Sequence, residues 1–128
     1  SLAKNNVFVT HSADEMFMRV DETNLGDKVA LDNNLFAGPA HWQQNTTHQD
    51  LSAWRGAHAP WDASSTAASA QLSDDGEFTT NKLVYDWSKA RPQAGSPALV
   101  GGADLSDYFV TDFTDAPRSP GGRGALGL

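Results

Sequence analysis

A short pattern recurs along this chain and constrains its fold more than any other feature: two asparagines followed by apolar and aromatic residues. The pattern occurs at Asn5–Val9 (NNVFV) and again at Asn33–Ala37 (NNLFA), 28 positions later (33 − 5). A weaker copy lies at Asn81–Tyr85 (NKLVY). β-branched and aromatic residues favour strands, and asparagine favours tight turns. A strand–turn unit that recurs every 20–50 residues or so is typical of a solenoid.

In a parallel β-helix, equivalent residues of successive turns of chain lie about 4.8 Å apart. Asparagines at such a bend can form a ladder of side-chain amides, and apolar residues form a continuous inner stack. We expect Asn33 to carry the ladder and Leu35 to point inward. An antiparallel sandwich uses the same residue types, so periodicity alone leaves both architectures open.

Strand character continues in both halves of the chain. The predicted strands are Met16–Val20, Val29–Phe36, Glu77–Trp87, Ser96–Val100 and Tyr108–Phe113, with a break near Asn33 and Asn34 and a stop at Gly38-Pro39. If the fold is a β-helix, we expect its coils at residues 5–37 and 77–113.

Between these coils, residues 38–76 lack strand alternation and predict one long loop excursion. The stretch holds three of the four tryptophans and three of the four histidines. Long loops are usually functional or disordered, and this aromatic content argues against disorder. Leu51, Trp54 and Ala57 fall at helical spacing behind Asp50, which indicates a short capped helix at Asp50–Ala57.

The charge and the composition exclude several classes of partner. The formal net charge is −7, and the nine basic residues are scattered along the chain. Nucleic-acid binding calls for clustered Lys and Arg, so we expect no nucleic-acid partner. We also expect no membrane insertion, because no run approaches the roughly 20 apolar residues that span a bilayer. The chain contains no cysteine, which excludes disulfides and thiolate ligands.

The C-terminal third resembles a known family. Trp87–Gly102 (WSKARPQAGSPALVGG) is similar to the last coil of secreted bacterial right-handed parallel β-helix proteins of the polysaccharide lyase-like group. The segments Thr111–Phe113, Asp115–Arg118 and Gly124–Gly127 continue the resemblance, although the usual glycine before the proline is absent. The resemblance does not extend over Ala40–Ala70.

This resemblance implies an all-β, right-handed parallel β-helix: one segment of residues 1–128 with a terminal cap at 114–128. It also implies an extracellular or cell-surface location. Prolines cannot donate to a strand ladder, so Pro92, Pro97, Pro117 and Pro120 would end the pairing. Arg118 would hold the cap by pairing with a nearby aspartate, or it is a solvated surface charge.

The N-terminal end differs, because a strand begins almost at once at Asn5. Solenoids need several repeats and capped ends, and about three turns are few. We therefore expect either the C-terminal part of a longer β-helix or an open first turn on which another protein chain stacks.

The aromatic excursion contains the candidate ligand site. Trp42, Trp54 and Trp61 could stack on sugar rings, and His41, Arg55 and His58 could hydrogen-bond hydroxyls or carboxylates. The alternative is that the tryptophans anchor a long segment to the core, since indoles bury a large apolar area.

We predict no metal site and no cofactor. His41, His48 and His58 do not have the spacing of a zinc motif. The acidic turns Asp21-Glu22 and Asp74–Glu77 could offer oxygens to Ca²⁺, but neither has the spacing of an EF-hand.

Three functions remain open from the sequence. The first is an extracellular β-helix segment with a structural or polysaccharide-binding role. The second is the C-terminal portion of a polysaccharide lyase or glycoside hydrolase, although no catalytic residue can be assigned. The third is a self-assembling surface fibre or adhesin subunit. The sequence does not decide whether the protein is an enzyme.

Overall fold

A computed structural model describes residues 2–21, 29–73, 91–108, 110, 111, 115, 117, 121 and 122. Within these residues the protein is mostly β, with one α-helix. The elements are β1 (Leu2–Lys4), β2 (Val7–Val9), β3 (Met16–Val20), β4 (Ala30–Asp32), β5 (Leu35–Ala37), β6 (His41–Gln44), β7 (Thr47–Gln49), α1 (Leu51–Ala57), β8 (Thr66–Ala67) and the 3₁₀ helix η2 (Pro97–Leu99).

The first three strands pair in parallel with the next three, and in the same order. β1 pairs with β4, β2 with β5, and β3 with β6. Val7 lies opposite Leu35 and Phe8 opposite Phe36, at the separation of 28 positions that also relates Asn6 to Asn34. This register confirms the alignment that the Asn-Asn repeat predicts. Parallel pairing contradicts the antiparallel alternative for these strands.

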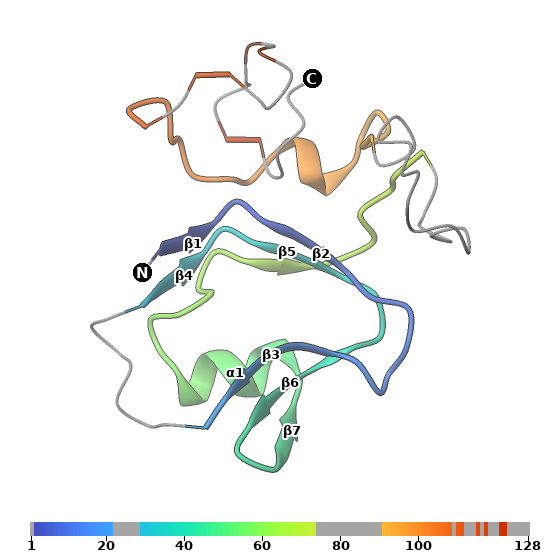
Figure 1. Cartoon of the computed structure of the whole chain (residues 1–128), viewed down its shortest axis with the longest axis vertical. Coiled ribbons are helices and arrows are strands. Elements are labelled where there is room, and N and C mark those ends of the chain that lie inside the picture. Colours follow the sequence, from blue (N-terminus) through green and yellow to red (C-terminus); the bar gives the residue numbers. More distant parts are fainter. Residues whose placement is uncertain are drawn as a thin grey trace.

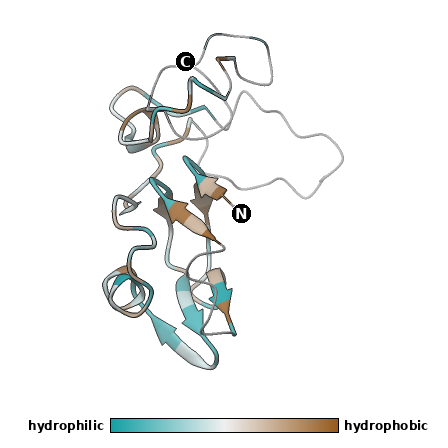
Figure 2. Ribbon diagram, turned by 90° about the vertical axis from the view of Figure 1, so that its left-hand side faces the viewer, coloured by the Kyte–Doolittle hydropathy of each residue, from teal (hydrophilic) through white to brown (hydrophobic). Residues whose placement is uncertain are grey.

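The strands form two layers with side chains between them. β1, β4, β2, β5 and β8 form one layer, and β3, β6 and β7 form the other, with α1 beside it (Figure 1). Figure 2 shows the same layers from the side, with the hairpin of β6 and β7 largely hydrophilic. Residues 91–108 cover the far face of the first layer (Figure 1).

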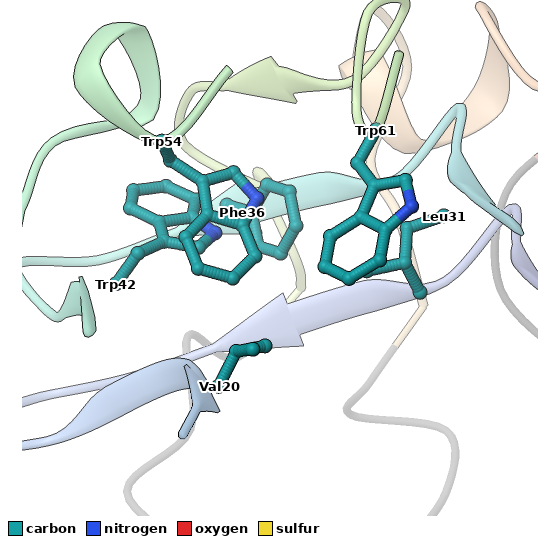
Figure 3. Close-up of a cluster of buried hydrophobic side chains, with 6 residues drawn as sticks. All are labelled: Val20, Leu31, Phe36, Trp42, Trp54 and Trp61. Carbon is teal, nitrogen blue, oxygen red and sulfur yellow. The ribbon is translucent and has the colours of Figure 1, made fainter. Parts of the chain in front are cut away.

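An inner cluster of buried side chains fills the space between the layers. Its members are Val20, Leu31, Phe36, Trp42, Trp54 and Trp61 (Figure 3). Phe8 stacks on Phe36 with ring centroids 5.2 Å apart, and the ring of Trp42 meets Phe36 edge-on at 4.8 Å. Strand pairing places Phe8 next to the equivalent Phe36, and Trp42 of the other layer extends this aromatic cluster.

An outer cluster lies on the opposite face of β5. It consists of Leu35, Ala37, Ala70 and Ala98. Successive side chains of a strand point to opposite faces, so Leu35 points away from Phe36. The predicted burial of Leu35 is confirmed, since its exposure is 0 %. Its predicted inward direction is wrong, because Phe36 occupies the inner position and Leu35 packs under residues 91–100.

The prediction of a long loop excursion over residues 38–76 is also wrong for the part that the structure describes, residues 38–73. β6 pairs with β3, and β8 pairs with β5, so both return to the strand layers. The sequence HWQQ of β6 hides its strand character because only Trp42 of the four residues is buried. Within the same stretch, α1 confirms the predicted helix, and the Asp50 side chain accepts from the Ala53 N–H at 2.8 Å.

The C-terminal predictions fall partly outside the described residues. Ser96–Val100 is not a strand, because η2 begins at Pro97 and the Ser96 hydroxyl accepts from the Ala98 N–H at 3.0 Å. Ser96 and Pro97 thus supply the cap and the first residue of a helical turn. The predicted strands at 77–87 and 81–85, most of the cap at 114–128 and Arg118 lie outside the described residues.

Candidate functional site

A row of three polar side chains lies at the bend that separates β1 from β2 and β4 from β5. We call it the corner ladder: Asn6, Asn34 and Asp62. The separation is 28 positions from Asn6 to Asn34 and 28 from Asn34 to Asp62. Asn34 and Asp62 are both 0 % exposed. Buried polar groups need partners, so this row can form only if its donors and acceptors match.

The hydrogen bonds of the ladder run in one direction. The Asn6 Nδ2 donates to the Asn34 Oδ1 at 3.0 Å, and the Asn34 Nδ2 donates to the Asp62 Oδ1 at 3.2 Å. The backbone N–H of Asn6 also donates to the Asn34 Oδ1, at 3.0 Å. A backbone N–H can only donate, which fixes the orientation of the Asn34 amide.

Asp62 ends the ladder as a pure acceptor. Its Oδ1 accepts from the Ser65 hydroxyl at 2.6 Å, and its Oδ2 accepts from the Trp54 Nε1 at 3.0 Å. Arg55 lies at the same bend, where its guanidinium donates to the backbone carbonyls of Asp62 and Ser65. Several donors around one carboxylate allow a charged group to stay buried. Arg55 is therefore committed to the backbone of this bend rather than to an external ligand.

Asn33 does not carry the ladder, which corrects the prediction. Its φ is 57°, and that of the equivalent Asn5 is 60°. This left-handed conformation, which asparagine tolerates, turns both side chains outward. The Asn33 Nδ2 donates to the Gly101 carbonyl at 3.3 Å, and Asn5 exchanges two hydrogen bonds with the backbone of Ala103. The first asparagine of each pair thus binds residues 101–103, and the second forms the ladder.

The three tryptophans are core side chains rather than the predicted sugar platform. Trp42, Trp54 and Trp61 are 3 %, 0 % and 5 % exposed, and all belong to the inner cluster (Figure 3). A sugar ring needs an open aromatic face, and these rings pack against their protein neighbours instead. The alternative reading of the sequence, in which the indoles anchor the stretch to the core, is the correct one.

The two histidines of the predicted site lie in different surroundings. His41 of β6 stacks on His48 of β7 at 3.7 Å, and its Nδ1 donates to the Ala13 carbonyl at 3.0 Å. His58 follows α1 and stacks on Trp61, with the ring centroids 5.2 Å apart. Burial lowers the pKa of His58. The Nε2 atoms of both histidines are buried and have no partner among the described residues.

The acidic residues that could bind Ca²⁺ do not form a site within the described residues. Asp21 pairs with Arg19 at 2.8 Å on the surface, and residues 22 and 74–77 lie outside the described residues. In the part of the chain that is described, no three His, Cys, Asp or Glu residues gather as metal ligands. None of the described helices is long and apolar enough to cross a membrane.

The first three strands leave one edge open. In each of the three sheets, the strand from β1, β2 or β3 is at the end of the order, so its outer edge pairs with no other described strand. Leu2 and Met16 on these strands are 56 % and 45 % exposed. Unpaired strand edges are templates for another strand, so this edge is a candidate binding surface.

Sequence reasoning missed Asp62 and Ser65. The pattern Asn-Asn is absent there, and three extra residues shift β8, so that Leu35 pairs with Thr66. A search at a fixed spacing of 28 from Asn34 would have found Asp62. No protein-family model, no curated protein and no solved structure matches this chain.

Proposed function

We propose that this chain is a structural segment of a right-handed parallel β-helix, whose role is to extend a stack of strands. The observation that carries the proposal is the ordered parallel pairing of β1, β2 and β3 with β4, β5 and β6. Parallel strands joined by crossover connections are almost always right-handed, which supports the handedness. Two further contacts join residues that are 28 positions apart: the hydrogen bond from Asn6 to Asn34 in the corner ladder and the stacked rings of Phe8 and Phe36.

A structural role agrees better with the described residues than the polysaccharide-binding alternative. The indoles that would bind sugar are buried, and Arg55 is occupied by backbone carbonyls. The lyase or hydrolase alternative and the extracellular location stay predictions that only the family resemblance supports.

Disulfide trapping tests the stack, because the chain contains no cysteine of its own. Leu2 lies opposite Ala30 in the parallel register. The double variant Leu2→Cys with Ala30→Cys should form an intramolecular disulfide under mild oxidation, since neighbouring strands bring Cα atoms within the 4.4–6.8 Å or so that a disulfide spans. The matched control, Lys4→Cys with Ala30→Cys, is displaced by two residues and should remain reduced. Equal cross-linking of both pairs would overturn the proposed stack.

A second measurement separates the structural role from the alternatives. Calorimetric titration with soluble acidic polysaccharides should give no saturable heat, and incubation should release no reducing or unsaturated sugar. Saturable binding would favour the polysaccharide-binding role, and product release would favour the enzyme.

A further inference from the structure

The hydrogen bonds of the corner ladder all donate from Asn6 toward Asp62. The open edge of β1 and β2 therefore ends the ladder with an acceptor. The Asn6 Nδ2 faces two acceptors, the Asn34 Oδ1 at 3.0 Å and the Lys4 carbonyl at 3.2 Å. An amide nitrogen has two hydrogens, so both are used and the amide cannot be flipped. The Asn6 Oδ1 is therefore the atom left over, and among the described residues it accepts no hydrogen bond.

From this polarity we infer that the open edge of β1 and β2 binds an extended polypeptide segment of another protein chain that carries an asparagine amide over Asn6. The inference rests on the proposed stacking function and specifies the chemistry of the partner. The segment would run parallel to β1 and β2. Its asparagine would donate a side-chain and a backbone N–H to the Asn6 Oδ1, as Asn6 itself does to Asn34.

The aromatic stack sets a second requirement. Phe8 follows Asn6 by two residues and stacks on Phe36, which follows Asn34 by two residues, at an interplanar angle of 9°. Phe8 is half-buried, and Phe36 is its only ring partner among the described residues. A partner of the pattern Asn-apolar-aromatic would therefore place an aromatic ring on Phe8 and an amide on Asn6 in the same register.

A second copy of this chain does not meet these requirements. One end of the ladder is the Asn6 Oδ1, and the other end is the Asp62 carboxylate, which only accepts. A head-to-head contact would place the Asn6 Oδ1 of one copy against that of the other, which leaves two acceptors unpaired. In a head-to-tail contact, the buried Asp62 at the other end of the ladder offers no donor to the Asn6 Oδ1. The net charge of −7 adds repulsion between copies. The polarity therefore selects a different partner chain and disfavours a self-assembled fibre.

The chain itself contains a segment of the required pattern, which supplies a probe. Residues 29–38, VALDNNLFAG, form the strands that already lie against the other edge of β1 and β2. A fluorescein-labelled synthetic peptide of this sequence, titrated with the full chain, should give a saturable rise in anisotropy. Deuterium exchange should show added protection at residues 2–9, with no loss at residues 30–37.

Two matched peptide variants test the polarity. Asn34→Asp in the peptide removes the amide donor and places a carboxylate opposite the Asn6 Oδ1, so binding should weaken about tenfold or more. Asn33→Asp changes the charge equally at the adjacent position, which turns outward and which aspartate also tolerates, so binding should change by about twofold or less.

The inference is overturned if peptide binding does not saturate at concentrations up to about 1 mM, or if both variants weaken equally. Sedimentation of the full chain into filaments would overturn it in favour of self-assembly. These results are distinguishable from failure of the proposed function: the Leu2–Ala30 disulfide would still form if the stack exists and only the partner chemistry is wrong.

Discussion

The two faces of β5 bury side chains of very different size. On the inner face, Phe36 packs among Phe8, Phe17 and Trp42. On the outer face, Leu35 and Ala37 cluster with the small residues Ala70 and Ala98, and no aromatic side chain of the described residues belongs to this cluster; Val7, Val9 and Leu72 pack against it. The inner face packs against strands of both layers, whereas the outer face is covered by residues 70–72 and 91–100. The same three-residue strand thus contributes to one core between the strand layers and to another that residues 70–72 and 91–100 cover.

The largest expected effect on stability comes from a substitution on the inner face of β5. Phe36→Ala should lower the free energy of unfolding by about 3–5 kcal/mol, because rigid aromatic neighbours cannot collapse into the space. Leu35→Ala is the matched control on the outer face and should cost less, since residues 91–100 can settle onto it. Urea unfolding followed by circular dichroism measures both. An equal or larger loss for Leu35→Ala would contradict the difference between the faces.

A second effect on stability is expected at the bend just before β5, where the adjacent Asn33 and Asn34 make different contacts. Asn34→Ala removes the middle of the corner ladder, so the Asn6 backbone N–H loses its acceptor and the Asp62 Oδ1 loses one of its two donors. We expect a loss of about 1–3 kcal/mol or more in the free energy of unfolding. Asn33→Ala loses one exposed hydrogen bond and the left-handed preference, so its cost should be near 1 kcal/mol. The reverse order in thermal unfolding would show that Asn33 is the structural asparagine after all.

A smaller effect of opposite sign is expected on α1, which touches the inner cluster through Trp54 but leaves Gly56 exposed. A Cβ built on Gly56 meets nothing within 4 Å. Gly56→Ala should therefore stabilise the protein by about 0.5–1 kcal/mol, because alanine loses less backbone entropy in a helix. Gly38 is the contrasting control, since its Cβ would lie 2.1 Å from the Thr10 carbonyl oxygen at a φ of 118°. Gly38→Ala should destabilise in the same thermal assay.

The smallest expected effect is a pH dependence at the edge of the inner cluster. Burial lowers the pKa of His58 below the model-peptide value of 6.5. The unfolded chain therefore takes up a proton first as the pH falls, so the free energy of unfolding should decrease from about pH 6.5 downward and level off below the native pKa. Urea titrations at several pH values measure this slope.

The variant His58→Phe keeps a ring on Trp61 without a titratable group, and it should remove that part of the slope. Glu15 supplies a separate contribution that both proteins share. Its pKa is lowered mainly by the backbone N–H of His11, then by that of Ser12. Stability from Glu15 is present above its unfolded pKa and is lost as the pH falls through the lower folded value. An unchanged slope in His58→Phe would exclude His58 as the cause.

Sequence reasoning found the repeat, its spacing and the capped helix, because each depends on local pattern. It failed over residues 38–76, where strand pairing is made by short, polar strands. β6 has only Trp42 buried, and β8 has no buried residue. Such strands form because the backbone of a neighbouring strand offers hydrogen-bond partners. The pattern of apolar residues in the sequence does not show where that neighbour will lie. The same limit applies to Asp62, which joins the ladder without any local copy of the Asn-Asn pattern.

What the sequence determined by itself is where the backbone can bend and where it must extend: asparagine pairs accept the left-handed turn, and β-branched and aromatic residues extend on either side. Only the tertiary structure decided which asparagine faces inward, which side of β5 is the inner face, and that Trp42, Trp54 and Trp61 are core rather than surface. The physical reason is that direction and burial depend on which strand lies alongside, and those partners are 24 to 31 positions distant along the chain.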